Sequence, residues 1–121
     1  MCIRDRLKNV DGNFVSPSEA NFAAAAAGAD WSKAPGMYLI LTNQPGANSW
    51  PITGASFILM HTTQDKPAMA KEVLKFFDWS FQKGKSAASS LDYVALPDSV
   101  TRMIRNIWKQ QIKNSAGKSV M

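Results

Sequence analysis

The sequence predicts an α/β fold that is rich in helices and has a few short strands. Two short apolar runs, Met37–Leu41 and Phe57–Met60, predict the strands. The second run is apolar at every position, which is typical of a strand covered on both faces. Two longer segments, 67–83 and 98–112, carry apolar residues at the 3.6-residue spacing of amphipathic helices.

Composition and charge favour an ordinary globular chain. At 121 residues the chain has the length of one domain, and its 45% apolar and 19% charged residues exclude a disordered polymer. The formal net charge is +5, but the lysines and arginines are scattered along the chain. This pattern favours solubility over a nucleic-acid-binding patch.

The cysteine content and the N-terminal residues say little about the compartment. The single cysteine, Cys2, excludes an internal disulfide. The longest apolar runs fall short of the roughly 18 residues of a transmembrane helix. Met1–Val10 is charged and no apolar segment follows it, so we expect no signal peptide in this chain. Residues Met1–Arg6 match no pattern of the rest and are interpreted as a non-native leader.

Turn and capping residues predict the first helix. Asp-Gly within Val10–Asn13 predicts a turn. Ser16 is the expected N-cap, Pro17 the first helical residue and Glu19 the partner in a capping box. The helix should continue through the alanine run and end near Gly28.

Two long helices are expected in the second half. Pro67 should open the first and Gly84 end it, with one apolar face formed by Ala70, Val73, Leu74, Phe77 and Phe81. Phe76 and Trp79 widen this face, so we expect the helix to be packed on more than one side.

A short helix over 86–91 and a turn at Leu96-Pro97 should precede the last helix. Asp98 or Ser99 is the expected cap of that last helix. Its apolar stripe consists of Val100, Met103, Ile104, Ile107, Trp108 and Ile112. The polar residues 114–121 are expected to form a loose tail.

No group of side chains in the sequence indicates a catalytic or metal site. His61 is the only histidine, and no further ligands stand at a suitable spacing for a metal ion. A nucleophilic Cys2 or serine would need a base and an orienting group. We therefore expect no enzyme, no catalytic residue, no metal and no cofactor.

Two weaker patterns have plainer interpretations. Thr53–Ser56 places two hydroxyls around Gly54, as in an oxyanion site, but it leads into a strand and lacks a helix N-terminus. A glycine bend before a strand explains it better. The last helix combines a basic face with Trp108, which would suit nucleic acid. A terminal helix that packs through its tryptophan explains this better.

The run Phe57–Met60 needs strand neighbours, and the rest of the sequence supplies almost none. We therefore expect the chain to be part of a larger protein. Several stretches, in this order and spacing, resemble the C-terminal third of the periplasmic phosphate-binding proteins of bacterial phosphate ABC transporters, the PstS family. These stretches are Asp11–Gly12, Val15–Pro17, Gly28–Lys33, Leu41–Gln44, Ser49–Thr53, Phe57–Leu59, Glu72–Trp79, Leu91–Tyr93 and Leu96–Val100.

The resemblance implies a C-terminal fragment of a two-lobed periplasmic-binding-protein (type 2) fold. It places residues 7–50 in the second lobe and 51–113 in a crossing strand and helices that return to the first lobe. The interlobe crossing is then formed by Trp50, Pro51, Ile52 and Thr53. In the family, serine and threonine hydroxyls, backbone amides, an arginine and an aspartate hold the phosphate, and no position here matches them. We expect no phosphate-binding residue in this segment.

The resemblance also implies a function and partners. The full-length protein would lie in the periplasm or at the cell surface, capture inorganic phosphate through its missing N-terminal part, and deliver it to the membrane permease of an ABC transporter. No nucleic-acid partner is expected. Two alternatives stay open: a binding protein for sulfate or molybdate, and a small basic helical module that binds nucleic acid.

Overall fold

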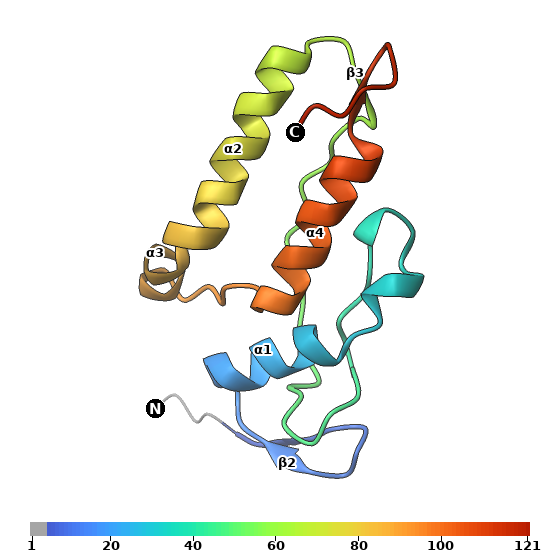
Figure 1. Cartoon of the computed structure of the whole chain (residues 1–121). Coiled ribbons are helices and arrows are strands. Elements are labelled where there is room, and N and C mark those ends of the chain that lie inside the picture. Colours follow the sequence, from blue (N-terminus) through green and yellow to red (C-terminus); the bar gives the residue numbers. More distant parts are fainter. Residues whose placement is uncertain (1–4) are drawn as a thin grey trace. The chain divides into compact units, whose positions relative to one another are not determined.

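The computed structural model describes residues 5–121 (Figure 1). The four residues before them belong to the expected leader at 1–6, which lies largely outside the described part. The chain divides into two compact units, Met1–Phe57 and Ile58–Met121. Within residues 5–121 it is helix-rich with four strands of two residues each, so the expectation of many helices and few short strands is confirmed.

The first unit begins with a small hairpin. Strands β1 (Leu7–Lys8) and β2 (Phe14–Val15) pair antiparallel, with Leu7 opposite Val15. The backbone N–H of Asn9 donates to the carbonyl of Asn13 at 2.9 Å. Gly12 supplies the left-handed conformation of the turn, with φ +85°. The turn predicted at 10–13 is confirmed.

Helix α1 (Glu19–Gly28) has a different cap from the expected one. Ser18, in extended conformation, is the N-cap, and its Oγ accepts from the backbone N–H of Asn21 at 3.3 Å. Glu19 is therefore the first helical residue, and the predicted capping box between Ser16 and Glu19 is wrong. The end at Gly28 is as predicted.

Short 3-10 turns η1 (Trp31–Lys33) and η2 (Pro35–Met37) follow α1. The indole N–H of Trp31 donates to the carbonyl of Ala26 at 2.7 Å, which fixes this buried ring to the helix. The buried apolar residues of the first unit are Val15, Ala25, Ala26, Ala29, Trp31, Leu41 and Trp50.

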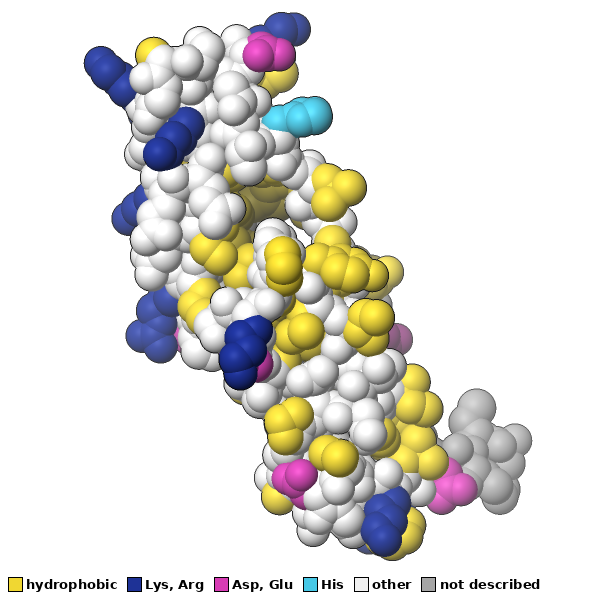
Figure 2. Space-filling model, turned by 90° about the vertical axis from the view of Figure 1, so that its right-hand side faces the viewer, with side chains coloured by type: hydrophobic (Ala, Val, Ile, Leu, Met, Phe, Trp, Pro, Cys, Tyr) yellow, Lys and Arg dark blue, Asp and Glu magenta, His cyan; other side chains and the backbone are white. Residues whose placement is uncertain are grey.

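The predicted strands at 37–41 and 57–60 are not formed. Among residues 5–121, none of the backbone groups from Gly54 to Met60 has a hydrogen-bond partner. The side chain of Leu59 is 94% exposed. Figure 2 shows hydrophobic side chains at the surface of the face that it draws. A strand exists only beside another strand, and the described part of the chain offers none to these segments.

The second unit contains helices α2 (Pro67–Lys83), α3 (Lys85–Ser90) and α4 (Asp98–Gln111), with α2 and α4 side by side (Figure 1). Strands β3 (Thr63–Gln64) and β4 (Lys113–Asn114) pair in parallel at one end.

The ends of these helices agree largely with the sequence. Pro67 occupies the first turn of α2 and Gly84 follows its last residue, both as predicted. Helix α3 begins one residue earlier than expected. In α4 the cap position belongs to Pro97, and Asp98 lies inside the first turn, so the predicted capping by Asp98 or Ser99 is wrong.

The core of the second unit joins α2, α4 and the C-terminal residues. Ala70, Leu74, Ile112 and Val120 form a buried cluster against which Met60 and Trp108 pack. Trp108 also stacks on Phe81, with ring centroids 5.8 Å apart and planes at 19°. This aromatic pair closes the inner side of α2 against α4.

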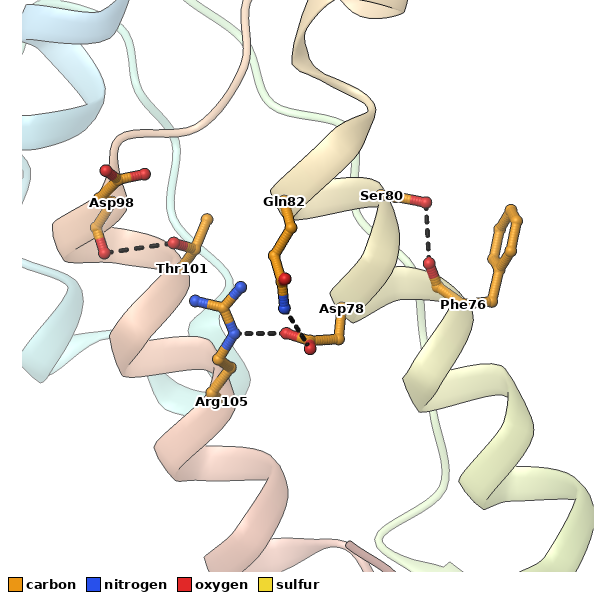
Figure 3. Close-up of polar contacts among 7 residues, drawn as sticks. All are labelled: Phe76, Asp78, Ser80, Gln82, Asp98, Thr101 and Arg105. Carbon is orange, nitrogen blue, oxygen red and sulfur yellow. Dashed lines mark hydrogen bonds and ion pairs between the residues drawn. The ribbon is translucent and has the colours of Figure 1, made fainter.

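A polar contact supplements this core. The Nε–H of Arg105 on α4 donates to the carboxylate of Asp78 on α2, and the amide of Gln82 donates to the same carboxylate at 2.7 Å (Figure 3). Both charged side chains are about three-quarters buried. Partial burial reduces screening by water, so this pair orients the two helices more effectively than an exposed pair would.

The C-terminal residues, expected to form a loose tail at 114–121, fold back in a hydrogen-bonded turn. The Oδ1 of Asn114 accepts from the backbone N–H groups of Ala116 and Lys118. Gly117 takes φ +75° in this turn. The turn returns the chain, so that the N–H of Val120 donates to the carbonyl of Ile112 at 3.1 Å and Val120 enters the core.

Leu74→Ala should lower the free energy of unfolding by about 2–5 kcal/mol, because it removes a fully buried side chain (0% exposed) from the core of the second unit. Leu91→Ala is the matched control: Leu91 is 69% exposed, and its truncation should change stability by about 0.5 kcal/mol or less. Urea unfolding followed by circular dichroism measures both. Equal losses in the two variants would contradict this assignment of the core.

Lys85→Met should raise the pKa of Asp98 toward its ordinary value of 3.8. In the folded chain the hydrogen bond from Lys85, 2.7 Å long, and then its charge lower that pKa. The contact therefore stabilises the fold at neutral pH, and its contribution is lost as the pH falls through the lowered pKa. NMR titration of the Asp98 carboxyl carbon checks this, and an unchanged pKa in Lys85→Met would refute the pairing.

Candidate interlobe crossing

The four residues assigned to the crossing lie in irregular backbone at the end of a loop of the first unit. Trp50 and Thr53 are buried, Pro51 is half-buried and Ile52 is exposed. The hydroxyl of Thr53 donates to the carbonyl of Trp50 at 2.9 Å, which closes a tight bend over the four residues. The backbone N–H of Asn43 donates to the carbonyl of Pro51 at 2.8 Å. The segment is therefore tied to the rest of its unit through Pro51, while the Thr53 hydroxyl bonds only within the segment.

Helix α1 anchors the start of the candidate segment 50–53. The backbone N–H of Trp50 donates to the carbonyl of Asn21 at 3.0 Å, and the Trp50 and Phe22 rings are 6.1 Å apart. The side-chain amide of Asn21 donates to the carbonyl of Ser16 at 2.8 Å. Asn21 thus links the segment before α1 to Trp50.

Asn9 fixes the loop that precedes the candidate segment 50–53. Its side-chain NH₂ faces three carbonyls, those of Gly46 and Ala47 at 3.0 Å and that of Ser49 at 3.3 Å. Its Oδ1 accepts from the N–H of Asn13 at 2.9 Å. The Asn9 side chain is buried, and these hydrogen bonds give its amide group the partners that water would otherwise supply. We call Asn9 with its partners in 46–49 the Asn9 clamp.

Two further contacts complete the loop. The carboxylate of Asp11 accepts from the N–H of Gly46 at 2.9 Å, and the hydroxyl of Ser49 donates to the carbonyl of Pro45 at 2.8 Å. Gly46 has φ +128°, and a Cβ at this position would lie 2.6 Å from the Ser49 hydroxyl. The loop therefore requires glycine at 46.

The clamp was missed in the sequence because its partners are distant in the chain. Asn9 lies beside an Asp-Gly turn, which is a recognisable local signal. The carbonyls that it binds are 37 to 40 residues further along, and no local pattern connects them.

The hydroxyls at 53–56 do not converge on an anion. The Thr53 hydroxyl is committed to the Trp50 carbonyl, and Ser56 is exposed. No helix starts near them, since the next one begins at Pro67. This arrangement agrees with a bend and lacks the N-terminal amides of an oxyanion site.

The described residues were compared with the side-chain groupings of metal-binding and other functional sites. Within 5–121 there is no group of three or more histidine, cysteine or carboxylate side chains placed to hold a metal ion. In the same part of the chain, every buried side-chain nitrogen or oxygen has a hydrogen-bond partner. His61 is exposed. None of the helices described there is long and apolar enough to cross a membrane.

Comparison with known proteins identifies the relatives of the chain. No family model matches it. It is 52% identical over 114 residues to the phosphate-binding protein PstS of Pasteurella multocida, a match that covers 94% of this chain and 33% of the relative. This chain is related to the C-terminal portion of the PstS phosphate-binding proteins. The PstS of Haemophilus influenzae is 50% identical over 88% of the chain, and that of Xylella fastidiosa 43% over 88%.

The resemblance predicted from the sequence is thereby confirmed. The chain spans about a third of the length of these PstS relatives, which is 33%, 32% and 29% in the three cases. The PstS relatives are thus about three times as long as this chain, which bears on the segments whose backbone has no hydrogen-bond partner in residues 5–121.

Asn9→Asp should destabilise the first unit by about 1–3 kcal/mol or more, because a carboxylate oxygen would replace the NH₂ group that faces three carbonyls. Asn48→Asp makes the same chemical change in the same loop, at an exposed position, and should have little effect. Hydrogen exchange of the amides of 46–50 checks this. Equal protection in the two variants would show that the Asn9 clamp does not hold the loop.

Proposed function

We propose that this chain is the scaffold and hinge portion of a phosphate-binding protein that serves an ABC phosphate importer. The observation that carries the proposal is its 52% identity, over 94% of its length, to a protein named as phosphate-binding. Identity of this degree over so many residues favours the same role for the same portion of the molecule.

The proposed architecture is the two-lobed type 2 fold. Residues 7–50 would complete the second lobe, and residues 51–113 would return to the first. Trp50, Pro51, Ile52 and Thr53 would form one crossing between the lobes. Their irregular backbone, which is bonded to other residues at Trp50 and Pro51, supports this assignment, because hinges are short segments that absorb changes in φ and ψ.

The phosphate ligands would come from the part of the protein outside this chain. The committed Thr53 hydroxyl and the lack of a helix N-terminus near 53–56 support this division of roles. Binding would proceed by closure of the lobes, driven by contacts that phosphate makes only in the closed state. This portion would contribute the geometry of closure and no contact to the anion.

The setting follows from the same family relationship. The full-length protein would act in the periplasm or at the cell surface and deliver phosphate to a membrane permease. It would be a binding protein and not an enzyme. The nucleic-acid alternative has weaker support, because Arg105, one of the two arginines of α4, is paired with Asp78.

The test compares this chain with a chimera in which it replaces the matching C-terminal third of the Pasteurella multocida protein. The chain alone should bind no phosphate at micromolar concentration in equilibrium dialysis, because it lacks the ligands. The chimera should bind phosphate saturably, because the scaffold is restored. The N-terminal two thirds without a C-terminal third serve as the control and should bind much more weakly.

Three outcomes would overturn the proposal. Saturable uptake by the chain alone would place an anion site at Thr53–Ser56. A folded chimera that binds no phosphate would show that the chain cannot act as the scaffold. Retention of the chain on DNA with a steep salt dependence would favour the nucleic-acid module.

A further inference from the structure

The support of the backbone changes within the candidate segment 50–53. Up to Pro51 the chain is bonded to the rest of its unit, since the Pro51 carbonyl accepts from the N–H of Asn43 at 2.8 Å. Among residues 5–121, no backbone group from Ile52 to Met60 has a hydrogen-bond partner. The chain therefore passes from a fixed backbone to an unsupported one directly after Pro51.

One side-chain hydrogen bond spans this transition. The hydroxyl of Thr53 donates to the carbonyl of Trp50 at 2.9 Å, and the two residues are only 6% and 8% exposed. Within residues 5–121 the Trp50 carbonyl has no other partner. The bond restrains the backbone dihedral angles between its two ends, and the ring of Pro51 already fixes one of them. The remaining freedom lies mainly at Ile52.

The residues at the end of this bend suit such a restraint. Threonine is branched at Cβ, so rotation about its χ1 is restricted and its hydroxyl is held in place. The next residue, Gly54, is the opposite case. A Cβ at Gly54 would meet no atom within 4 Å, and the φ of this glycine lies outside the left-handed region. Neither crowding nor φ requires glycine there, so the restraint on the bend ends at Thr53.

We propose that Thr53 is a positioning residue of the hinge: its bond to the Trp50 carbonyl restrains the backbone that rotates when the lobes close. The bond thereby raises the affinity for phosphate without any contact to the anion. This inference rests on the proposed function. A hinge that samples many orientations loses more conformational entropy on closure than a restrained one. Loss of the bond should therefore broaden the open state and weaken phosphate binding.

The competing explanation is that the hydroxyl only satisfies a buried carbonyl. Helix α4 contains a contact of the same kind that separates the two explanations. Thr101 is 3% exposed, and its hydroxyl donates to the carbonyl of Asp98, also three residues earlier, at 3.2 Å (Figure 3). There the helix itself fixes the backbone. Removal of the Thr101 hydroxyl should therefore affect stability and free no rotation.

The experiment uses the chimera with the Pasteurella multocida protein and measures phosphate binding by calorimetry. Thr53→Val keeps the shape of the side chain and removes the hydroxyl, and Thr53→Ser retains the hydroxyl. Thr53→Val should raise the Kd for phosphate about two- to tenfold, the range expected for one hydrogen bond. Thr53→Ser should restore most of the affinity. Thr101→Val, the matched control, should leave the Kd unchanged.

A second measurement separates hinge restraint from stability. Spin labels are attached to cysteines at the exposed positions 33 and 109, one in each unit, in a background without other cysteines. Without phosphate, the distribution of distances between the labels should be broader in Thr53→Val than in the parent chimera and in Thr53→Ser. Thr101→Val should not broaden it, even where it lowers the melting temperature.

The outcomes separate this inference from the proposed function. An unchanged Kd in Thr53→Val would overturn the inference, while phosphate binding by the parent chimera would leave the proposed function intact. An equal loss of affinity in Thr101→Val would also overturn it, because Thr53 would then contribute only to stability. Weaker binding with an unchanged distance distribution would overturn it as well, since a hinge effect requires the broader distribution.

A failure of the chimera does not prevent the test. In a folded chimera that binds no phosphate, the proposed function is contradicted and the distance distributions decide the inference. If the chimera does not fold, ¹⁵N relaxation of the amides of Ile52, Thr53 and Gly54 is measured in this chain. Lower order parameters in Thr53→Val than in Thr53→Ser would support the inference, and equal values would overturn it.

Discussion

A backbone amide or carbonyl inside a protein needs a hydrogen-bond partner, and this requirement governs how the chain can be understood. The segment Gly54–Met60 has apolar side chains on both sides and, within residues 5–121, no partner for its backbone groups. In water these groups are solvated, but its side chains are then exposed as well. Only flanking strands satisfy both demands together, because they pair the backbone and lie beneath covering layers. The PstS relatives of this chain are about three times as long, and the further residues of such a protein can supply these flanking strands.

Different kinds of interaction stabilise the interior of each of the two units. In the first, long-range hydrogen bonds to Asn9, Asn21 and Asp11 position a loop that has little regular structure. In the second, apolar packing of α2 against α4 predominates, with the Asp78–Arg105 pair beside it. Hydrogen bonds depend on direction and can therefore fix the conformation of an irregular loop. Helices with an apolar stripe need mainly a complementary apolar surface to pack against.

The sequence predicted those features that depend on neighbours in the chain. The Asp-Gly turn, the opening of α2 at Pro67, its end at Gly84 and the stripe of α4 were all recognisable from local spacing. The caps of α1 and α4 were misplaced by one or two residues, because Ser16 and Ser18 both suit the cap of α1 and the cap of α4, Pro97, has no capping side chain. The prediction of a strand at 57–60 was wrong for these residues, because strand formation depends on pairing with residues distant in the sequence. The four crossing residues could be located only through the resemblance, and the Asn9 clamp depends on contacts that no local pattern encodes.

The long span of the Asn9 clamp has a consequence for the order of folding. Asn9 cannot complete its bonds until Ser49, some forty residues later, has been synthesised, so the loop at 46–49 is fixed only after the hairpin and α1 exist. All of these partners nevertheless precede Ile58, the first residue of the second unit. During synthesis these contacts can therefore form before the helical unit emerges, since parts of a chain tend to fold in the order of their translation.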